Sequence, residues 1–178
     1  MALELNGTTG VSLVQDGVIT DANLPAGSVL QVVEGRLTSR QGNSTQTFAS
    51  VGLSASITPS STTSKILVTV SVNSISCSTG SGVHLRLKRG STFPISNTSG
   101  GTIDTDDGFF AGGGAITDSS RQRASGTISF VDSPSTTAEI TYDVEMRCTD
   151  SGTGYINGLD LTVGNGSVST ITLMEIAG

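Results

Sequence analysis

The chain contains one histidine, and its surroundings argue against nucleophilic catalysis. His84 lies in a stretch of alternating apolar and polar residues, so a strand would place it on the same face as Arg86 and Lys88. A serine or cysteine nucleophile needs a neighbouring base and a third group that orients this base. No carboxylate lies in sequence register with His84, and the chain has no Gly-x-Ser-x-Gly motif. We therefore expect no catalytic residues of the hydrolase kind.

Two carboxylates, Asp143 and Glu145, have a spacing that glycoside hydrolysis could use. They lie two residues apart in the segment AEITYDVEMRC, which puts them on one face of a strand at about 7 Å. That separation falls in the range of inverting glycosidases. Glu139 and Arg147 belong to the same segment, so the simpler interpretation is a solvated strand face. We expect the protein not to be an enzyme.

A short acidic stretch offers the candidates for a metal site. Asp104, Asp106 and Asp107 precede Gly108 and supply the oxygen donors that Ca²⁺ prefers. The spacing of an EF-hand loop and its closing glutamate are missing. A solvated acidic turn is the simpler interpretation, and we expect no bound metal or other cofactor.

The composition indicates an ordered, acidic chain. Its 178 residues fit one sandwich or barrel domain with a short appendage. Serine and threonine number 52, but the net charge is only -6 and the apolar residues are concentrated in alternating runs, which favours order over disorder. The isoelectric point of about 4.5 argues against nucleic-acid binding. No apolar run is long enough for a membrane span and no secretion signal is evident, so we expect no membrane insertion.

Alternation with a period of two residues predicts an all-β fold. In residues 64–76, Ile66, Val68, Val70 and Val72 alternate with polar or smaller residues, which is typical of a strand with one buried face. We predict strands at residues 29–37, 47–53, 54–59, 64–76, 82–90, 92–96, 123–132, 138–148 and 170–177. Residues 158–164 fit either a further strand or a structured loop. No segment has the period of a helix.

Cys77 and Cys148 lie near the ends of two predicted strands. A disulfide is geometrically feasible if those strands are neighbours, but sequence spacing cannot place the sulfurs within bonding range. We favour two reduced, partly buried thiols.

The first 28 residues differ from the rest of the chain. They consist of short apolar pieces broken by turn signals such as Asn6-Gly7 and Asp16-Gly17. Such a segment is either a flexible leader or an extended arm that orders against a partner. As a docking arm, its anchors would be Leu13, Val14, Val18, Ile19 and Leu24.

Two long irregular segments, residues 97–121 and 149–166, could bind a ligand or cover the core. Phe109, Phe110 and Tyr155 are the candidate ligand contacts. The alternative for the Phe109-Phe110 pair is a plug over the end of the sandwich.

The run LELNGTTGVSLVQDGVITDANLPAGSVLQVV resembles the leaders of structural proteins from tailed bacteriophages. The stretch FASVGLSASITPSSTTSKILVTVSVNSIS and the following GVHLRLKRGST are similar to the same group of fibre and decoration proteins. The strand order, which ends in STITLMEIAG, resembles the jelly roll of the TNF/C1q-like fold, typically a homotrimer. The resemblance implies a jelly-roll β-sandwich at residues 29–178 behind an extended N-terminal docking arm at residues 1–28, and it carries no catalytic residues.

The resemblance also implies a non-enzymatic protein of the virion, assembled in the host cytoplasm. We expect a homotrimeric decoration protein, of the cement or head-fibre type, attached through its arm to the major capsid protein or another virion protein. Strand faces rich in serine, threonine and valine would permit close subunit packing without burying charge. The alternative is a short tail-fibre or adhesin module that binds a host-surface receptor through its long loops.

Overall fold

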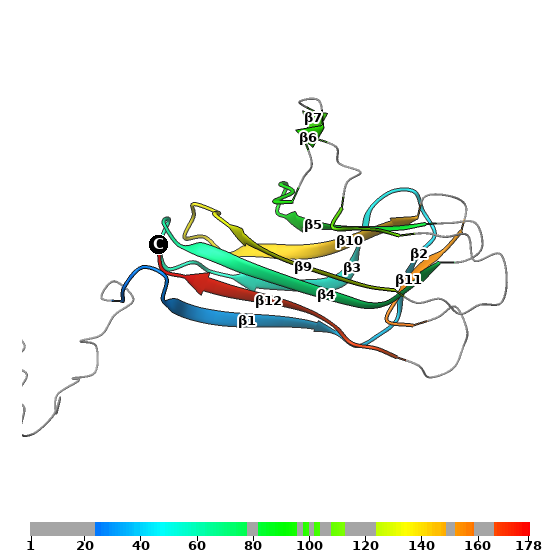
Figure 1. The fold of residues 1–178 in the computed structure, drawn as a ribbon, viewed down its shortest axis with the longest axis horizontal. Coiled ribbons are helices and arrows are strands. Elements are labelled where there is room, and N and C mark those ends of the chain that lie inside the picture. The colour runs from blue at the N-terminus through cyan, green and yellow to red at the C-terminus, as the bar shows by residue number, and fades with distance from the viewer. Residues whose placement is uncertain are drawn as a thin grey trace, which may run out of the picture.

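The computed structural model describes residues 24–77, 82–95, 98–99, 102–103, 108–112, 124–148, 152–158 and 166–178 (Figure 1). These residues form twelve strands and no helix, which confirms the all-β prediction. The strands are β1 (Val29–Leu37), β2 (Gln41–Asn43), β3 (Ala49–Ile57), β4 (Lys65–Cys77), β5 (Val83–Arg89), β6 (Thr98–Ser99), β7 (Thr102–Ile103), β8 (Phe110–Gly112), β9 (Ala124–Asp132), β10 (Ile140–Cys148), β11 (Gly154–Ile156) and β12 (Ser169–Ile176).

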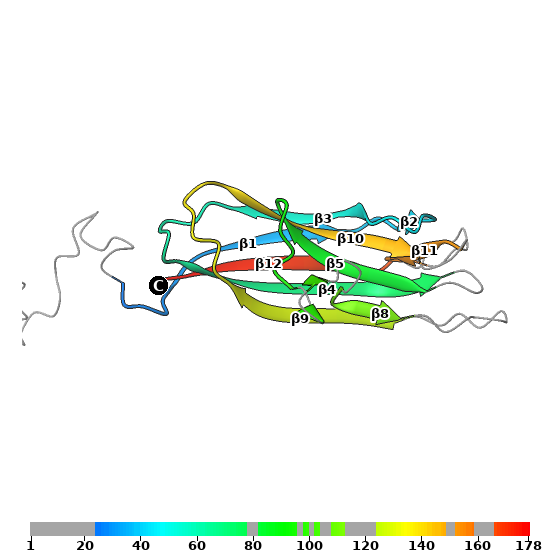
Figure 2. The same cartoon turned by 90° about the horizontal axis from the view of Figure 1, so that it is seen from above.

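Two antiparallel sheets pack face to face as a β-sandwich (Figures 1 and 2). The larger sheet has the order β1-β12-β4-β11-β2, and β9 also pairs with β4, from Ile66 to Ile75. The smaller sheet has the order β3-β10-β5-β8. A separate hairpin joins β6 and β7. The last strand, β12, therefore lies between the first strand and β4, in the interior of the larger sheet.

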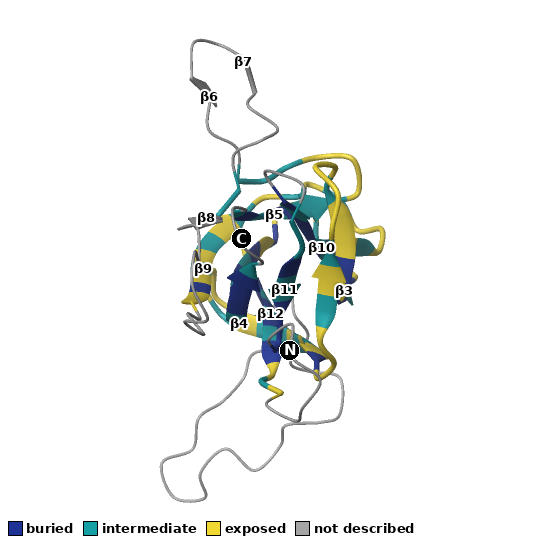
Figure 3. Ribbon diagram, turned by 90° about the vertical axis from the view of Figure 1, so that its right-hand side faces the viewer, coloured by how far each residue is buried: buried dark blue, intermediate teal, exposed yellow. Residues whose placement is uncertain are grey.

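The core lies between the sheets, where the alternating apolar side chains meet (Figure 3). Ile66, Val68 and Val70 of β4 are fully buried, and Leu85 and Val144 of the smaller sheet are buried in the same cluster. Each such side chain contributes about 1.5–3 kcal/mol through the apolar surface that it removes from water. The alternation seen in the sequence is thus the cause of the two-layer packing.

Two details differ from the predicted strands. Residues 47–53 and 54–59 were expected to form two strands, but they belong to the single strand β3. Gly52 has a φ of 76° and the register shifts opposite it, between Asp143 and Glu145, so the glycine marks a β-bulge and not a strand end. Residues 92–96 do not form the predicted strand, because Thr92 makes only an isolated bridge with Arg89 that closes a turn.

Other differences concern short elements. The strands β2, β8 and β11 are each three residues long and were not predicted. Residues 158–164, which we could not assign from sequence, lie outside the described residues except for Gly158.

A buried tyrosine connects the two sheets at one edge of the sandwich. The hydroxyl of Tyr142, on β10, donates a hydrogen bond of 2.7 Å to Asp132 Oδ2 at the end of β9. Arg89 Nε, at the end of β5, lies 3.2 Å from the same oxygen. Burial, together with the hydrogen bond to and the charge of Asp132, raises the pKa of Tyr142, so the phenol stays protonated. Asp132 of the larger sheet thus binds two residues, Tyr142 and Arg89, that are paired with each other in the smaller sheet.

A buried carboxylate organises the end of the sandwich near the C-terminus. Glu175 of β12 is fully buried and accepts hydrogen bonds of 2.7 Å from both the amide and the hydroxyl of Ser60. Gln31 of β1 donates to its other oxygen. Burial alone would raise the pKa of Glu175, but the hydrogen bonds from Gln31 and Ser60 outweigh it and hold the pKa below its ordinary value.

We predict that Glu175→Gln lowers the free energy of unfolding by about 2 kcal/mol at neutral pH, because the hydrogen bonds to a charged acceptor are lost. A lowered pKa in the folded state means that the unfolded chain binds the proton more readily. The wild type should therefore lose this contribution as the pH falls below 4.5, the ordinary pKa of a glutamate. The difference in free energy of unfolding between the wild type and the variant should then narrow.

Urea unfolding at neutral and at acidic pH measures the effect. Glu34→Gln is the matched control, because Glu34 is exposed on the neighbouring strand and should change stability little. If the free energies of unfolding of the wild type and Glu175→Gln differed equally at both pH values, the stabilising role of the charged Glu175 would be contradicted.

Candidate interaction surfaces

The outer face of the larger sheet carries an apolar row that crosses four strands. Val32 of β1, Met174 of β12, Leu67 of β4 and Val131 of β9 are successive partners in register. Val32 and Val131 are 56% and 53% exposed, whereas Met174 and Leu67 are half-buried. The strand pairing therefore places four apolar side chains side by side on the outside of the sandwich.

Two further rows beside it are rich in hydroxyl groups. In register, these rows are Glu34, Thr172, Thr69 and Ser129, and then Arg36, Thr170, Ser71 and Thr127. We call the apolar row and these two rows together the hydroxyl-rich face. Its only charged side chains are Glu34 and Arg36 at the β1 edge, and they form an ion pair of 3.0 Å.

Four of the six hydroxyl groups of this face are hydrogen-bonded to one another in pairs. Thr69 and Ser129 are hydrogen-bonded across β4 and β9 at 2.9 Å, and Thr127 donates to Ser71 at 3.4 Å. Small hydroxyl side chains that are already hydrogen-bonded cost little to remove from water. The face can therefore pack against another protein surface without leaving charges unpaired.

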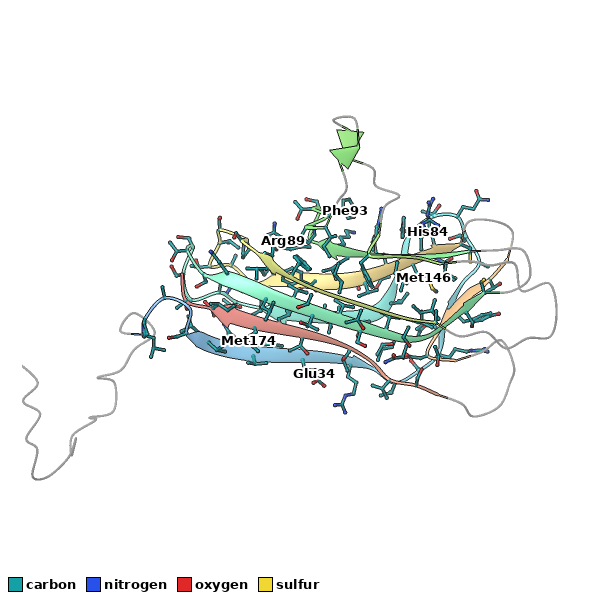
Figure 4. All side chains as sticks on the ribbon, viewed as in Figure 1. Glu34, His84, Arg89, Phe93, Met146 and Met174 are labelled. Carbon is teal, nitrogen blue, oxygen red and sulfur yellow. The ribbon has the colours of Figure 1, made fainter. Side chains whose placement is uncertain are left out.

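The outer face of the smaller sheet has the opposite chemistry. The guanidinium of Arg86 stacks between the rings of Phe48 and Phe93, at 4.0 and 4.4 Å from their centroids. Arg147 lies 5.1 Å from the Phe48 ring. Figure 4 shows Phe93 and His84 on this side of the sandwich and Met174 on the other. We call Phe48, Arg86, Phe93, Glu145 and Arg147 the stacked arginine cluster.

Glu145 is bound inside this cluster, so the prediction of a solvated strand face was wrong here. Its Oε2 lies 2.6 Å from Arg86, and its Oε1 lies 3.4 Å from Lys88. Only 6% of Glu145 is exposed, because β10 lies between β3 and β5 and aromatic rings stack over the Arg86 that holds its carboxylate. The carboxylate is thus engaged by cations and is not open to a sugar substrate.

Asp143 differs from its neighbour. It is half-buried and accepts a hydrogen bond of 2.7 Å from Ser50. Burial raises the pKa of Asp143, against the effect of the Ser50 hydroxyl. The two carboxylates that looked equivalent in the sequence therefore have different surroundings, and only Asp143 is partly exposed.

His84 faces Arg147 across the β5–β10 ladder. Its Nδ1 is buried and has no hydrogen-bond partner in the part of the chain that the structure describes. A carboxylate does reach this face, which the sequence of β5 alone could not show, because Glu145 belongs to the neighbouring strand. That carboxylate is held by Arg86, and within the described residues no hydrogen bond from an acid to His84 Nδ1 is present, as a nucleophile–base pair would need.

The chain enters the sandwich beside its C-terminus (Figure 1). The amide of Gly27 donates to the carbonyl of Ala177, and the amide of Ala177 donates to the carbonyl of Ser28, both at 2.8 Å. Leu24, one of the predicted arm anchors, is half-buried. The other four anchors, Leu13, Val14, Val18 and Ile19, lie outside the described residues.

The opposite end of the sandwich carries β2 and β11 (Figure 2). Tyr155 of β11 is half-buried and Arg40 lies over its ring at 5.1 Å. Beneath them, the buried Asn157 donates to the carbonyl of Leu37 at 2.7 Å and accepts from the Ser169 hydroxyl at 2.6 Å. Side-chain hydrogen bonds thus hold a short strand that has little apolar surface of its own.

The remaining sequence candidates are two phenylalanines and three aspartates. Phe109 is half-buried and packs against the core, as the plug alternative predicts. Phe110 is the first residue of β8 and pairs with Leu85, and its side chain is not described. Asp104, Asp106 and Asp107 lie outside the described residues, and the described part of the chain has no group of acidic, histidine or cysteine residues that could hold a metal ion.

Comparison with models of known protein families and with curated proteins finds no match to this chain. Within the described ranges, no helix has the length and apolar character that crossing a membrane requires. Inferences about function therefore rest on the surfaces themselves.

We predict that Glu145→Gln lowers the free energy of unfolding by about 3 kcal/mol, because the largely buried ion pair between Glu145 and Arg86 is lost. Adding Arg86→Met should recover part of the loss, which a double-mutant cycle measures. Glu139→Gln is the control, because Glu139 is exposed. A loss for Glu145→Gln no larger than that of the control would show that the cluster contributes nothing to stability.

Proposed function

We propose that this chain is a non-enzymatic structural protein of a tailed-phage particle. In this proposal it is a homotrimeric decoration protein, of the cement or head-fibre type, that attaches to the capsid surface through its N-terminal arm. Its partners would be two further copies of itself and the major capsid protein or another virion protein.

The order of the strands supports a jelly roll as the finer description of the fold. Apart from β2, β6, β7 and β11, one sheet contains β1, β4, β9 and β12 and the other contains β3, β5, β8 and β10. Successive strands of this set change sheet at every step except from β5 to β8. Two four-stranded antiparallel sheets wound in this way are typical of jelly rolls. The resemblance of the sequence to fibre and decoration proteins points in the same direction.

The hydroxyl-rich face is the feature that best supports the proposed trimer. A four-strand row with exposed valines at both ends is larger than the isolated apolar residues found on most protein surfaces. Next to it, the hydroxyl rows could be covered without the desolvation cost of a charge. The stacked arginine cluster on the other sheet lacks these properties, so we assign subunit packing to the larger sheet.

The position of the arm supports attachment at one end. Residues 24–28 lie beside the C-terminus. An arm that precedes them would therefore contact a surface that faces this end of the sandwich. Ordering such an arm costs on the order of 1–2 kcal/mol per residue in backbone entropy. A trimer carries three arms, and their combined binding can offset this cost.

A tail-fibre or adhesin module is the second candidate. Its support is the end of the sandwich away from the arm, where Tyr155 and Arg40 form an amphipathic stack of the kind that often contacts sugars or proteins. In this case the same trimer would bind a host-surface receptor at its free end.

We predict that Thr69→Lys converts the trimer into a folded monomer, because three lysines would be buried in the centre of the subunit contacts. Light scattering should give three times 18.0 kDa for the wild type and one such mass for the variant. Thr141→Lys is the matched control, since Thr141 also lies on a central strand and shares a 2.7 Å hydrogen bond with Ser56, but on the other sheet. A monomeric wild type, or dissociation by the control alone, would overturn the assignment.

We predict that deleting residues 2–23 leaves a folded sandwich that no longer binds particles, because the two sheets and the core between them are built from residues that follow this segment. Circular dichroism checks the fold and co-sedimentation with particles checks binding. Binding that survives the deletion would remove the arm from the proposal.

Copy number in purified particles separates the two candidate functions. A number comparable with that of the major capsid protein would support decoration, whereas a small fraction of it would support a tail fibre. Absence from particles would overturn both.

A further inference from the structure

Two cysteines from facing sheets lie close to one glycine at the end of the sandwich that is remote from the termini. Cys77, the last residue of β4, is the cross-strand partner of Gly154 in β11. Gly154 is in turn the partner of Asn43 in β2. The three residues therefore form one row across the larger sheet, with neighbouring Cα atoms about 5 Å apart.

Cys148 lies above this row from the smaller sheet. A Cβ built on Gly154 would lie 3.1 Å from Cys148 Sγ and 2.7 Å from Val83 Cγ2, so any side chain at position 154 would occupy the space beside the sulfur. The Cys148 thiol donates to the carbonyl of Asn43 at 3.1 Å. The sulfur of Cys148 is thus held over the middle of the row.

Cys77 projects toward the same space. Directly opposed residues of an antiparallel pair have their side chains on the same face of the sheet. Gly154 directs its missing side chain into the core, and Cys77 packs against the core cluster accordingly. With glycine between them, no side chain of the row separates the two sulfurs. Both cysteines are thiols in the structure.

We propose that Cys77 and Cys148 are the site of an intramolecular disulfide that forms on exposure to an oxidant and links β4 of one sheet to β10 of the other. The two residues are 71 positions apart in the chain, so the bond would close a large loop across the core. Rotation of the Cys148 side chain from Asn43 toward Cys77 is the movement that the bond requires.

The oxidant we name is a small-molecule disulfide, glutathione disulfide. Cys77, the half-buried member of the pair, attacks as the thiolate, forms a mixed disulfide and releases one glutathione. Cys148 then displaces the second glutathione and completes the protein disulfide. Overall two S–H bonds break and one S–S bond forms, while glutathione disulfide takes up two electrons and two protons and leaves as two glutathione molecules.

Burial raises the pKa of Cys77, which keeps its thiolate fraction small near neutral pH. The exchange should therefore accelerate as the pH rises above neutral. If the proposed function holds, the bond would remain open in the reducing cytoplasm where the particle is assembled and close after release. The bond itself does not depend on that function.

Intact-chain mass spectrometry tests the proposal. The full-length protein is incubated with glutathione disulfide, unfolded in denaturant and treated with iodoacetamide. We expect a mass lower by two hydrogen atoms, no alkylation of either cysteine, and a peptide that joins Cys77 to Cys148 within one chain. Alkylation of both cysteines, a glutathione adduct that persists on Cys77, or a disulfide between two chains would overturn it.

A relocated thiol provides the matched control. Ser76 faces away from Cys77 along β4 and donates to the carbonyl of Gly158. In the double variant Ser76→Cys, Cys77→Ser the number of thiols is unchanged but one lies on the wrong face of the strand. We expect both of its cysteines to be alkylated after the same treatment, and equal disulfide formation in this variant would also overturn the proposal.

Discussion

Every long strand of this protein places one face in the space between the two sheets, and this burial determines what the other face can do. The apolar side chains of β4 and β10 alternate toward a shared core, so the intervening residues are directed outward. Hydrophobic burial supplies the main driving force for such a sandwich. Because the period of a strand is two residues, the outer faces are specified as strictly as the core.

The two outer faces have different chemistry, and this difference is the basis for the functional argument. On the larger sheet the apolar row and the hydroxyl rows form a surface whose burial carries only a small desolvation cost. On the smaller sheet Arg86, Glu145 and Lys88 form an ion-pair group, and Phe48 and Phe93 stack on its arginine. The first surface suits contact with other copies of the chain, whereas the second satisfies its own charges and stabilises its own sheet.

The two ends of the sandwich differ in a similar way. At one end Glu175 binds the Ser60 turn and Gln31, and the chain enters beside Ala177. At the other end short strands are held by Asn157 and Ser169, and two thiols approach Gly154. Both candidate functions proposed above use this difference between the two ends.

The sequence by itself determined the all-β class and the long strands, because alternation is a local property of neighbouring residues. Residues 29–37 were predicted with the bounds that β1 has, and the inward residues of β4 were identified correctly. Short strands such as β2 and β11 were missed, since three residues carry too little periodicity and form only where a partner strand supplies hydrogen bonds.

Only the tertiary structure decided which residues meet across strands. The row Val32, Met174, Leu67 and Val131 comes from four separate segments, and its alignment depends on the registers of three ladders. Glu145 was expected on a solvated face, but it is paired with Arg86 from β5, and Phe48, the residue before β3, stacks on that arginine. The physical reason is that charge pairing and burial depend on distances between strands, and those distances are set by long-range pairing that no single segment encodes.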